Sequence, residues 1–374
     1  MTRVCLVGYG RVGRVTGREL RRRGYEVQVY DANRANVLRA REEGFQATLA
    51  DVASSRAARD IASSCSAVAT ALPGLAAMPV IESLVEAGAG LVVDVSYLPD
   101  PFRLRRVAEK YGASIVVDAG LAPGLSNILL YHSARSVKNP VEALIYVGGL
   151  AADPEKAPLG LVASWNIMDL LEEYTRPARA RVGGVQAELD PVADATTVEV
   201  PGAGVFEALP TDGLRTLLET LQEPRTMVEY TLRYPGHVET LRSLRVLGLL
   251  EERSYVAEGC AASPRRLLAK LLEERLPAEG DRVVLYTRVV GAGGLVSGLE
   301  FYLDVSQEEL GLRGVTALAF LTGFMHAWFV DRALRGGVPA GVVPPEALHG
   351  DALSLVGELR GRGVPVSRRR CEEE

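Results

Sequence analysis

The stretch Val4-Cys5-Leu6-Val7-Gly8-Tyr9-Gly10-Arg11-Val12-Gly13 decides the fold of this chain. Four apolar residues, typical of a buried strand, lead into the spacing G-x-G-x-x-G at the start of a helical pattern. Gly8 permits the tight turn, Gly10 lets a pyrophosphate approach the backbone, and Gly13 lets the helix pack closely on the strand. The N–H groups at the helix N-terminus, including those of the loop residues Tyr9, Arg11 and Val12, then face the phosphates.

An acidic residue stands where such a dinucleotide site needs one. Asp31 ends the next strand-like run, and its carboxylate would accept hydrogen bonds from the adenosine ribose hydroxyls. A phosphate on the 2′ oxygen would be repelled there, so the motif predicts NAD as the cofactor. Arg34 tempers this preference, because a nearby arginine can accommodate that phosphate.

Short apolar runs alternate with helical patterns over residues 1 to about 120, which predicts parallel βαβ units. The fold class we expect is α/β, a doubly wound parallel sheet of the Rossmann type. Ligands bind such sheets at the carboxyl ends of the strands. Two loops placed there are expected to line the cofactor, namely Leu72, Pro73 and Gly74, and Ser96 and Tyr97.

The pattern changes from about residue 141, where strand-like runs adjoin glycine pairs and prolines. This indicates a second, α+β domain with a mixed, more antiparallel sheet. Residues 291–294, Gly-Ala-Gly-Gly, predict a hairpin turn between two strands. Helices are expected over residues 165–174, 211–221 and 315–335, and the last residues are expected to be a solvated tail.

Composition narrows the function classes. The chain has 374 residues, 48% of them hydrophobic, and a formal net charge of −5, so neither disorder nor a nucleic-acid partner is predicted. The most apolar window, residues 314–330, is shorter than the roughly 20 residues of a membrane span and predicts a buried helix. No signal peptide is recognisable, so we expect a cytoplasmic protein. The four cysteines are scattered, predict neither a zinc site nor a disulfide framework, and leave Cys5 as a small core residue.

Longer motifs carry a family resemblance. Asp118-Ala119-Gly120-Leu121-Ala122-Pro123-Gly124-Leu125-Ser126-Asn127 resembles the saccharopine dehydrogenase family. Further stretches resemble its L-lysine 6-dehydrogenase branch: residues 146–150, Ser164-Trp165, 172–179, 211–217 and 231–237. The resemblance covers most of residues 1–250 and is looser over 255–345.

The resemblance implies a domain plan. It comprises an NAD-binding Rossmann domain (1–125), a substrate and dimerisation domain (126–312), a C-terminal helix returning to the first domain (313–350) and a tail (351–374). It further implies a homodimer. The implied reaction is NAD-dependent oxidative deamination of the lysine ε-amine, which releases ammonia and a semialdehyde that cyclises.

The substrate of that reaction suggests its ligands. Arg233 and Arg176 are candidates to hold the carboxylate, because a guanidinium fork matches it. Asp118, Thr211 and Asp212 offer acceptors for the ammonium groups. Tyr174 could donate to substrate oxygens.

The ε-amine must lose a proton before hydride can leave its carbon, so a base is expected near the nicotinamide. The candidates are Asp118, which precedes the turn of Gly120, Pro123 and Gly124 beside the cofactor, and His237, which follows Arg-Tyr-Pro-Gly. No residue cluster predicts a metal site. Two other functions stay open: a saccharopine-type dehydrogenase, which forms or cleaves a secondary amine, and a non-catalytic dinucleotide-binding regulator.

Overall fold

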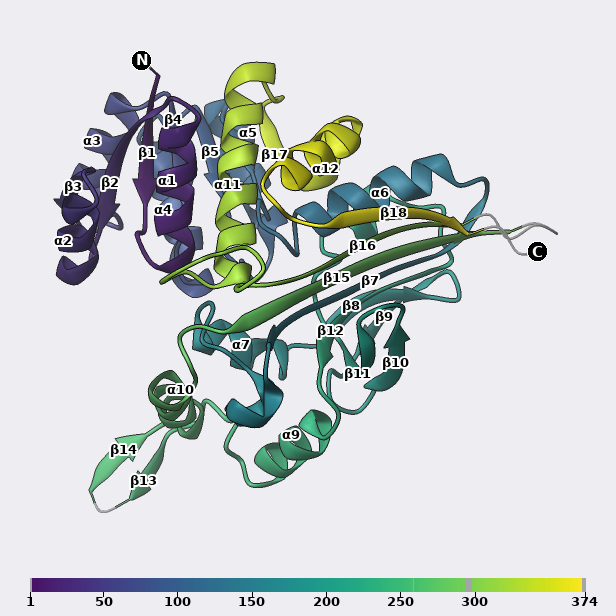
Figure 1. Ribbon diagram of the computed structural model, residues 1–374. Coiled ribbons are helices and arrows are strands. Elements are labelled where there is room, and N and C mark those ends of the chain that lie inside the picture. The colour runs from purple at the N-terminus through teal and green to yellow at the C-terminus, as the bar shows by residue number, and fades with distance from the viewer. Residues whose placement is uncertain (1, 258, 293–297, 372–374) are drawn as a thin grey trace. The chain divides into compact units, whose positions relative to one another are not determined.

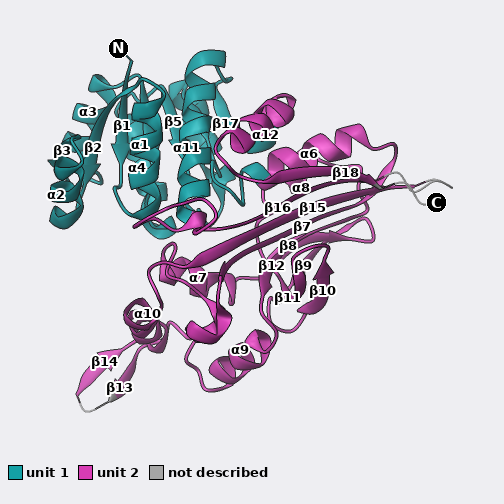
Figure 2. Ribbon diagram, viewed as in Figure 1, with its two compact units in different colours: residues 1–125, 319–347 teal, residues 126–318, 348–374 magenta. Residues whose placement is uncertain are grey.

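The computed structural model describes residues 2–257, 259–292 and 298–371 (Figure 1). The chain divides into two compact units, coloured separately in Figure 2. Unit 1 comprises Met1–Leu125 and Ala319–Ala347, and unit 2 comprises Ser126–Leu318 and Leu348–Glu374. No helix among the described residues is long and apolar enough to cross a bilayer.

Unit 1 is built on a parallel sheet of seven strands in the order β17-β6-β5-β4-β1-β2-β3. The first six strands follow the 3-2-1-4-5-6 order of a Rossmann sheet, which confirms the predicted fold class. The strands are β1 (Arg3–Val7), β2 (Glu26–Asp31), β3 (Gln46–Leu49), β4 (Ala67–Thr70), β5 (Leu91–Asp94), β6 (Ser114–Val116) and β17 (Gly341–Val343). The helices are α1 (Arg11–Arg22), α2 (Arg34–Glu42), α3 (Ser55–Ser64), α4 (Gly74–Glu86), the 3-10 helix η1 (Pro101–Leu104), α5 (Arg105–Tyr111) and most of α11 (Ala317–Gly336).

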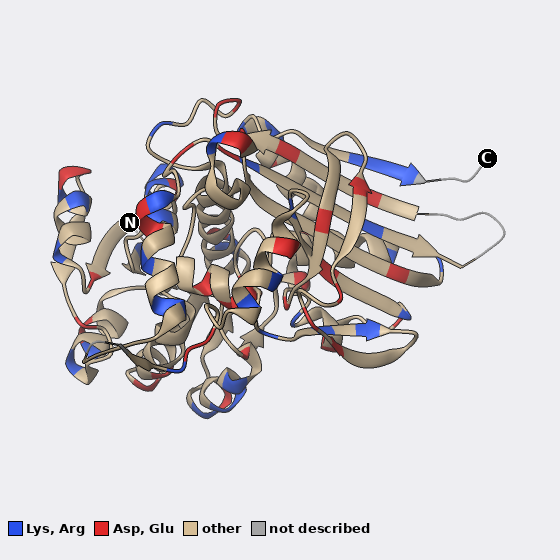
Figure 3. Ribbon diagram, turned by 90° about the horizontal axis from the view of Figure 1, so that it is seen from below, with Lys and Arg blue, Asp and Glu red and all other residues tan. Residues whose placement is uncertain are grey.

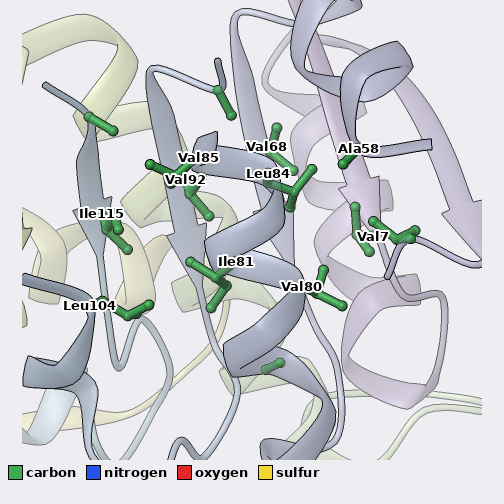
Figure 4. Packing of buried hydrophobic residues seen from close by; sticks show 14 of the residues in the cluster. Val7, Ala58, Val68, Val80, Ile81, Leu84, Val85, Val92, Leu104 and Ile115 are labelled. Carbon is green, nitrogen blue, oxygen red and sulfur yellow. The ribbon is translucent and has the colours of Figure 1, made fainter. Parts of the chain in front are cut away.

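A continuous apolar cluster holds one face of this sheet to its helices. Figure 4 shows Ile81 and Leu84 of α4 among side chains from the strands, such as Val7 and Val92. These residues are buried almost completely. Burial of each large apolar side chain contributes about 1.5–3 kcal/mol, so the cluster fixes the strand order and with it the loops at the strand ends.

Helix α11 packs on α1 although about 300 residues separate them in the chain. A Cβ at Gly323 would lie 2.5 Å from that of Val15, so only a glycine allows this approach. The buried ring of His326 adds two hydrogen bonds, with Thr16 (Nδ1, 3.2 Å) and with the carbonyl oxygen of Val93 (Nε2, 3.0 Å). The helix predicted over residues 315–335 is therefore part of the dinucleotide-binding unit.

Unit 2 contains a mixed sheet ordered β10-β11-β12-β7-β15-β16-β18, with β8 and β9 attached beside β12. Its strands are β7 (Pro140–Ala151), β8 (Ala178–Val182), β9 (Val185–Leu189), β10 (Thr196–Val200), β11 (Gly204–Pro210), β12 (Thr226–Arg233), β15 (Asp281–Gly291), β16 (Gly298–Ser306) and β18 (Val366–Cys371). Strands β7 and β12 are parallel, whereas β15 is antiparallel to both β7 and β16. The predicted mixed sheet is confirmed. The hairpin pairing of β15 with β16 is also found, although residues 293–294 of its turn lie outside the described residues.

The remaining elements of unit 2 surround this sheet. They are α6 (Leu125–Ser136), the 3-10 helices η2 (Pro154–Lys156) and η3 (Pro158–Gly160), α7 (Ile167–Glu173), α8 (Leu217–Thr220), α9 (His237–Val246), the small strands β13 (Tyr255–Ala257) and β14 (Cys260–Ala262), α10 (Pro264–Arg275), η4 (Pro345–Asp351) and α12 (Ala352–Gly361). The side chains of α7 and α10 pack together with Leu209 and Val238 in a separate apolar cluster. This cluster anchors the ends of β11 and α9, which carry the polar residues described below.

Two expectations from the sequence are wrong in this region. The helix expected over residues 211–221 shrinks to α8, because Gly213 packs against the Glu229 carboxyl and Arg215 has a positive φ of 46°. The C-terminal residues, expected to form a solvated tail, instead form α12 and the strand β18. Strand β18 pairs with β16 through residues such as Val366 and Leu303, so a partner distant in sequence orders it.

A disulfide bond joins Cys5 of β1 to Cys65 at the end of α3, which corrects the sequence-based expectation about the cysteines. The two residues are 60 positions apart. They meet because β1 pairs with β4, and Cys65 lies just before β4. Cys5 also lies in the apolar cluster, as expected of a core residue.

The disulfide generates a stability prediction. Substitution Cys65→Ser should lower the free energy of unfolding by about 2–4 kcal/mol, because the bond restrains a long loop in the unfolded chain. Urea unfolding under non-reducing conditions measures the effect. A reductant should destabilise the wild type similarly and leave Cys65→Ser unchanged. Cys260→Ser, at an exposed free thiol, is the matched control and should behave as wild type. Equal stability of all three proteins would contradict the prediction.

Candidate functional site

The glycine loop of unit 1 has the geometry that its sequence predicts. Gly8 has a φ of +96°, and a Cβ there would overlap the carbonyl oxygen of Ala71. A Cβ at Gly13 would overlap the carbonyl oxygen of Gly8, so α1 touches the strand at backbone distance. A Cβ at Gly10 would meet no atom within 4 Å. The open position is therefore the one at which a pyrophosphate would approach the backbone.

Asp31 lies at the end of β2 and is already engaged by three donors. Its carboxylate accepts hydrogen bonds from the backbone N–H groups of Tyr9 and Asn33, both at 2.6 Å, and from the Asn36 side chain at 3.1 Å. A carboxylate offers about four acceptor directions, which leaves capacity for one further donor such as a ribose hydroxyl. These residues fit the adenosine half of a dinucleotide. Arg34, the first residue of α2, is exposed nearby in the chain.

The other loops predicted to line the cofactor also end parallel strands of unit 1. Ser96 Oγ accepts a hydrogen bond of 3.1 Å from the backbone N–H of Leu72, which joins the loops after β4 and β5. Pro73 and Gly74 begin α4, and Tyr97 follows Ser96. The turn after β6 is closed by a bridge between Gly120 and Gly124 around Pro123. A Cβ at Gly124 would overlap Gly120, so the turn requires a glycine there.

Asp118 lies two residues beyond β6 and is 1% exposed. Its φ of +54° is unusual for a residue other than glycine. Such a conformation costs free energy and persists only where the surroundings enforce it, often at functional sites. The structure thus holds this carboxyl in a fixed, buried position at the end of the sheet.

In unit 2, one face of β12 presents three polar residues. Glu229, Thr231 and Arg233 alternate with apolar residues, and because side chains alternate across a strand they share one face. All three are buried. Thr231 Oγ1 lies 2.8 Å from Thr211 Oγ1, so the predicted residue Thr211 joins this polar face from the end of β11.

Arg233, Tyr174 and His237, all predicted from the sequence, form one hydrogen-bonded chain. Arg233 Nε donates to the Tyr174 hydroxyl at 2.9 Å, and the same hydroxyl lies 3.0 Å from His237 Nε2. His237 Nδ1 lies 3.1 Å from the carbonyl oxygen of Leu159. A carbonyl can only accept, so Nδ1 carries the ring proton and Nε2 accepts from Tyr174.

Burial keeps His237 neutral. Desolvation is the main cause that lowers its pKa to about 3, and the charge of Arg233 lowers it further. The ring is held at the first turn of α9, where Glu207 accepts hydrogen bonds from the N–H groups of Gly236 and Val238. Both ring nitrogens of His237 are therefore used within unit 2.

The other predicted substrate ligands have protein partners. Asp212 makes a bidentate ion pair with Arg179, with both N···O distances 2.8 Å. Arg176 bonds to Glu172 through Nε at 3.4 Å. Arg233 also contacts Glu173 at 3.3 Å. Burial raises the pKa of Glu173 to about 7 although Arg233 and Arg176 oppose the rise.

Glu229 is a residue that the sequence reasoning missed. It is 5% exposed, and its Oε2 atom has no hydrogen-bond partner within the part of the chain that the structure describes. Burial is the main cause that raises its pKa well above the usual value, and the nearby charges of Glu173 and Asp212 add to the rise. The alternation Glu-x-Thr-x-Arg could have revealed it, because three polar residues at a spacing of two mark a polar strand face.

The site residues thus fall into two sets. Unit 1 carries the glycine loop, Asp31, the strand-end loops and Asp118, whereas unit 2 carries the cluster around β12. Figure 3 shows further basic residues on the strand near the C terminus, which are Arg368–Arg370 of β18; three strands separate β18 from β12. Among residues 2–257, 259–292 and 298–371, no group of three or more His, Cys, Asp or Glu side chains is placed to hold a metal ion.

These features define a protein with a Rossmann-type dinucleotide-binding unit and a second unit built on a mixed sheet. Family models agree with this class. Residues 4–87 match the TrkA-N domain, and residues 120–364 match the saccharopine dehydrogenase C-terminal domain. The chain belongs to the saccharopine dehydrogenase family, and its first unit contains a nicotinamide-dinucleotide-binding domain.

The chain is also similar to two mammalian mitochondrial proteins. The mitochondrial alpha-aminoadipic semialdehyde synthase of Mus musculus is 25% identical over 260 residues, which are 65% of this chain and 28% of that protein. The Rattus norvegicus enzyme of the same name is 25% identical over 303 residues, 76% of this chain and 30% of that protein. The chain therefore spans less than a third of the length of these relatives.

The chain is also similar to solved structures. The apo saccharopine dehydrogenase (L-Glu forming) of Saccharomyces cerevisiae has a TM-score of 0.77 and 20% sequence identity, and the match covers 99% of this chain and 100% of that one. At this identity the similarity shows the fold.

The neutral state of His237 predicts a pH dependence of stability. Its pKa is lower in the folded protein than in the unfolded chain, so its contribution is present above about pH 6.5 and is lost as the pH falls towards 3. Between pH 7 and pH 5 this loss amounts to about 2 kcal/mol for this one group. His237→Gln should remove that part of the pH dependence in denaturant unfolding experiments.

Tyr174→Phe is the matched control for this experiment. It removes the hydroxyl that bonds to Nε2 but keeps the ring burial that mainly lowers the pKa, so most of the pH dependence should remain. If His237→Gln loses stability in parallel with wild type between pH 7 and pH 5, another group causes the acid sensitivity.

Proposed function

We propose that this protein is an NAD-dependent oxidoreductase that acts on the CH–NH2 group of L-lysine. It removes the ε-amine by oxidative deamination and yields ammonia and the 6-semialdehyde, which cyclises to piperideine-6-carboxylate. The family supports a dehydrogenase, and the name of the mammalian relatives refers to alpha-aminoadipic semialdehyde, which is the same compound as the proposed product. The dinucleotide, when bound, supplies the nicotinamide C4 that accepts hydride.

The observation that carries the choice of substrate is the state of the buried carboxyls in unit 2. Glu173 and Glu229 are both buried, and burial is the main cause that raises the pKa of each. A bound ammonium group would stabilise their ionised forms. Lysine carries two ammonium groups and one carboxylate, and thus brings the net positive charge that the cluster favours.

Within this proposal each predicted residue has a role. Arg176 binds the substrate carboxylate. Arg233 contributes a second positive charge to the same carboxylate and is held in place by Tyr174 and Glu173. Thr211 and the Asp212–Arg179 pair shape the ammonium site with Glu229. His237 is a positioning residue, because its neutral ring fixes the Tyr174 hydroxyl.

Asp118 is the proposed base. In its ionised form it accepts a proton from the substrate ε-ammonium, so that the neutral amine can release hydride from its carbon and become an imine. Water then adds to the imine carbon, and ammonia leaves. Lysine, NAD+ and water thus give semialdehyde, ammonium, NADH and one proton.

A saccharopine-type reaction is the second candidate, and the full-length match to a saccharopine dehydrogenase favours it. Saccharopine carries three carboxylates and would need an additional arginine clamp. The buried guanidinium of Arg233 is already committed to Tyr174, Leu232 and Glu173, and that of Arg179 to Asp212. These pairings favour the lysine substrate.

The domain roles and the assembly follow from the same proposal. Residues 1–125 with the helix of 313–350 bind NAD, and residues 126–312 bind substrate and contribute the surface of a cytoplasmic homodimer. Light scattering coupled to size-exclusion chromatography measures the mass of the assembly, and a mass of one chain would contradict the dimer.

An NADH assay tests the reaction. Absorbance of NADH should rise with L-lysine and NAD+, and ammonia should appear in equal amount. Saccharopine should give no more NADH than the buffer control. Asp118→Asn should lower kcat with lysine at least about a hundredfold, as expected for the loss of a general base. Turnover of saccharopine without turnover of lysine would replace the proposal with the second candidate, and NADH from neither would favour a non-catalytic regulator.

The cofactor preference has its own test. Asp31→Asn should weaken NADH binding at least about tenfold, because a hydrogen bond to a charged acceptor contributes about 1.5–3 kcal/mol. NADPH binding should weaken less, because the repulsion of its 2′-phosphate disappears as well. Fluorescence titration gives both Kd values. Arg34→Ala is the matched control and should affect NADPH more than NADH; equal losses for both cofactors in Asp31→Asn would contradict the preference.

A further inference from the structure

A second buried carboxyl lies beside the strand end that carries Asp118. Asp94 is the last residue of β5 and is fully buried in unit 1. Strands β5 and β6 are neighbours, with Val93 opposite Val116. The backbone carbonyl of Asp94 accepts a 2.9 Å hydrogen bond from the N–H of Ala119, the residue after Asp118. The two aspartates are therefore fixed to one another through the backbone.

The Asp94 side chain is held by donors from two loops. Its Oδ1 accepts hydrogen bonds from Thr70 Oγ1 (2.6 Å) and Ser96 Oγ (2.8 Å), and its Oδ2 accepts from the Ser96 N–H (3.1 Å). Ser96 in turn accepts the bond from the N–H of Leu72. The carboxyl of Asp94 thus connects the ends of β4 and β5, and its backbone carbonyl binds the segment after β6 that carries the proposed base.

Burial and charge both act on this carboxyl. Desolvation is the main cause that raises the pKa of Asp94 to about 7, and the charge of Asp118 adds to the rise. Of the other ionisable groups near this strand end, His326 of α11 donates to the adjacent Val93 carbonyl and is neutral, since burial lowers its pKa to about 4. Tyr97 lies in the loop that follows. Two close buried carboxyls cannot both ionise without a large electrostatic cost.

We propose that Asp94 is a positioning residue for Asp118 and that the two carboxyls act as a pair which holds one proton in the resting protein. This inference rests on the proposed role of Asp118 as base. The pair carries one negative charge, on Asp118, and one proton, on Asp94. When Asp118 accepts a proton from the substrate ammonium, the pair holds two protons and no charge. It returns to the resting state by releasing one proton to solvent.

The pairing has a consequence for the pH range of the base. The proton on Asp94 removes a like charge beside Asp118, and this favours the ionised form of Asp118 that accepts a proton. When Asp94 loses its proton at higher pH, it carries a second negative charge. This like charge increases the proton affinity of Asp118. Asp94 therefore adjusts the proton affinity of Asp118 without touching the substrate.

Carbon-13 NMR of protein labelled at the aspartate carboxyl carbon tests the pair without requiring turnover. Asp94→Asn and Asp118→Asn identify the two resonances by their disappearance. Asparagine preserves the side-chain volume at Asp94, and it is one of the residues that best tolerates the positive φ of Asp118. In Asp118→Asn, the titration of Asp94 should move down by about one pH unit, because its like-charged neighbour is gone. An unchanged titration of Asp94 would overturn the pairing.

The kinetic arm uses the pH profile of kcat/KM with lysine. In Asp94→Asn the profile should lose the titration step near pH 7 that Asp94 causes, while KM for lysine changes less than kcat. Asp331→Asn is the matched control, a buried aspartate of α11 in the same unit, and it should keep that step. A profile of Asp94→Asn that matches wild type would overturn the inference.

The two arms separate this inference from the proposed function. If the NMR titrations of Asp94 and Asp118 are coupled but the protein does not oxidise lysine, the carboxyl pair is supported and the proposed lysine reaction is contradicted. If the protein oxidises lysine but the two titrations are independent, the reaction is supported and the pair is contradicted.

Discussion

Helix α1 is held at close range on both sides, and the dinucleotide site depends on this constraint. On one side, Gly13 touches the backbone of Gly8, and Gly17 lies where a Cβ would come within 3.2 Å of Leu6. On the other side, Gly323 of α11 presses against Val15 and the backbone of Val12. Any shift of α1 would overlap one neighbour or open a gap at the other, and either costs packing energy. The position of the helix N-terminus is therefore fixed by glycines as distant in the chain as Gly13 and Gly323.

Close packing also buries polar groups in both units. In unit 1, Asp94 lies where three parallel strands end, and in unit 2, Glu229 lies on a strand face closed by Gly213. Burial raises the pKa of both carboxyls. It lowers the pKa of His237 and His326, so the histidines remain neutral. These effects oppose one another with pH: the carboxyl contribution to stability is greatest in acid and is lost as the pH rises, whereas the histidine contribution is lost in acid.

How far the sequence predicts this structure follows from the range of the interactions. The parallel units and the glycine loop were predictable, because their signals lie within about 30 residues of one another. The disulfide was not, since Cys5 and Cys65 meet only through the pairing of β1 with β4. Strand β18 was also missed, because its run of arginines looks solvated until β16 is available to pair with it.

In the candidate site, too, some features were predictable from the sequence and others were not. Tyr174, Arg233 and His237 could be chosen from separate motifs, but the direction of their hydrogen bonds could not, because it depends on the carbonyl of Leu159 accepting from His237. That single acceptor fixes the ring proton on Nδ1, and the fixed proton decides that Tyr174 donates to Nε2 and accepts from Arg233. A histidine that looks like a base in the sequence is thereby a hydrogen-bond acceptor that orients its neighbour. Asp118, beyond the end of β6, is buried and has a positive φ, and it is the group that we propose as the base.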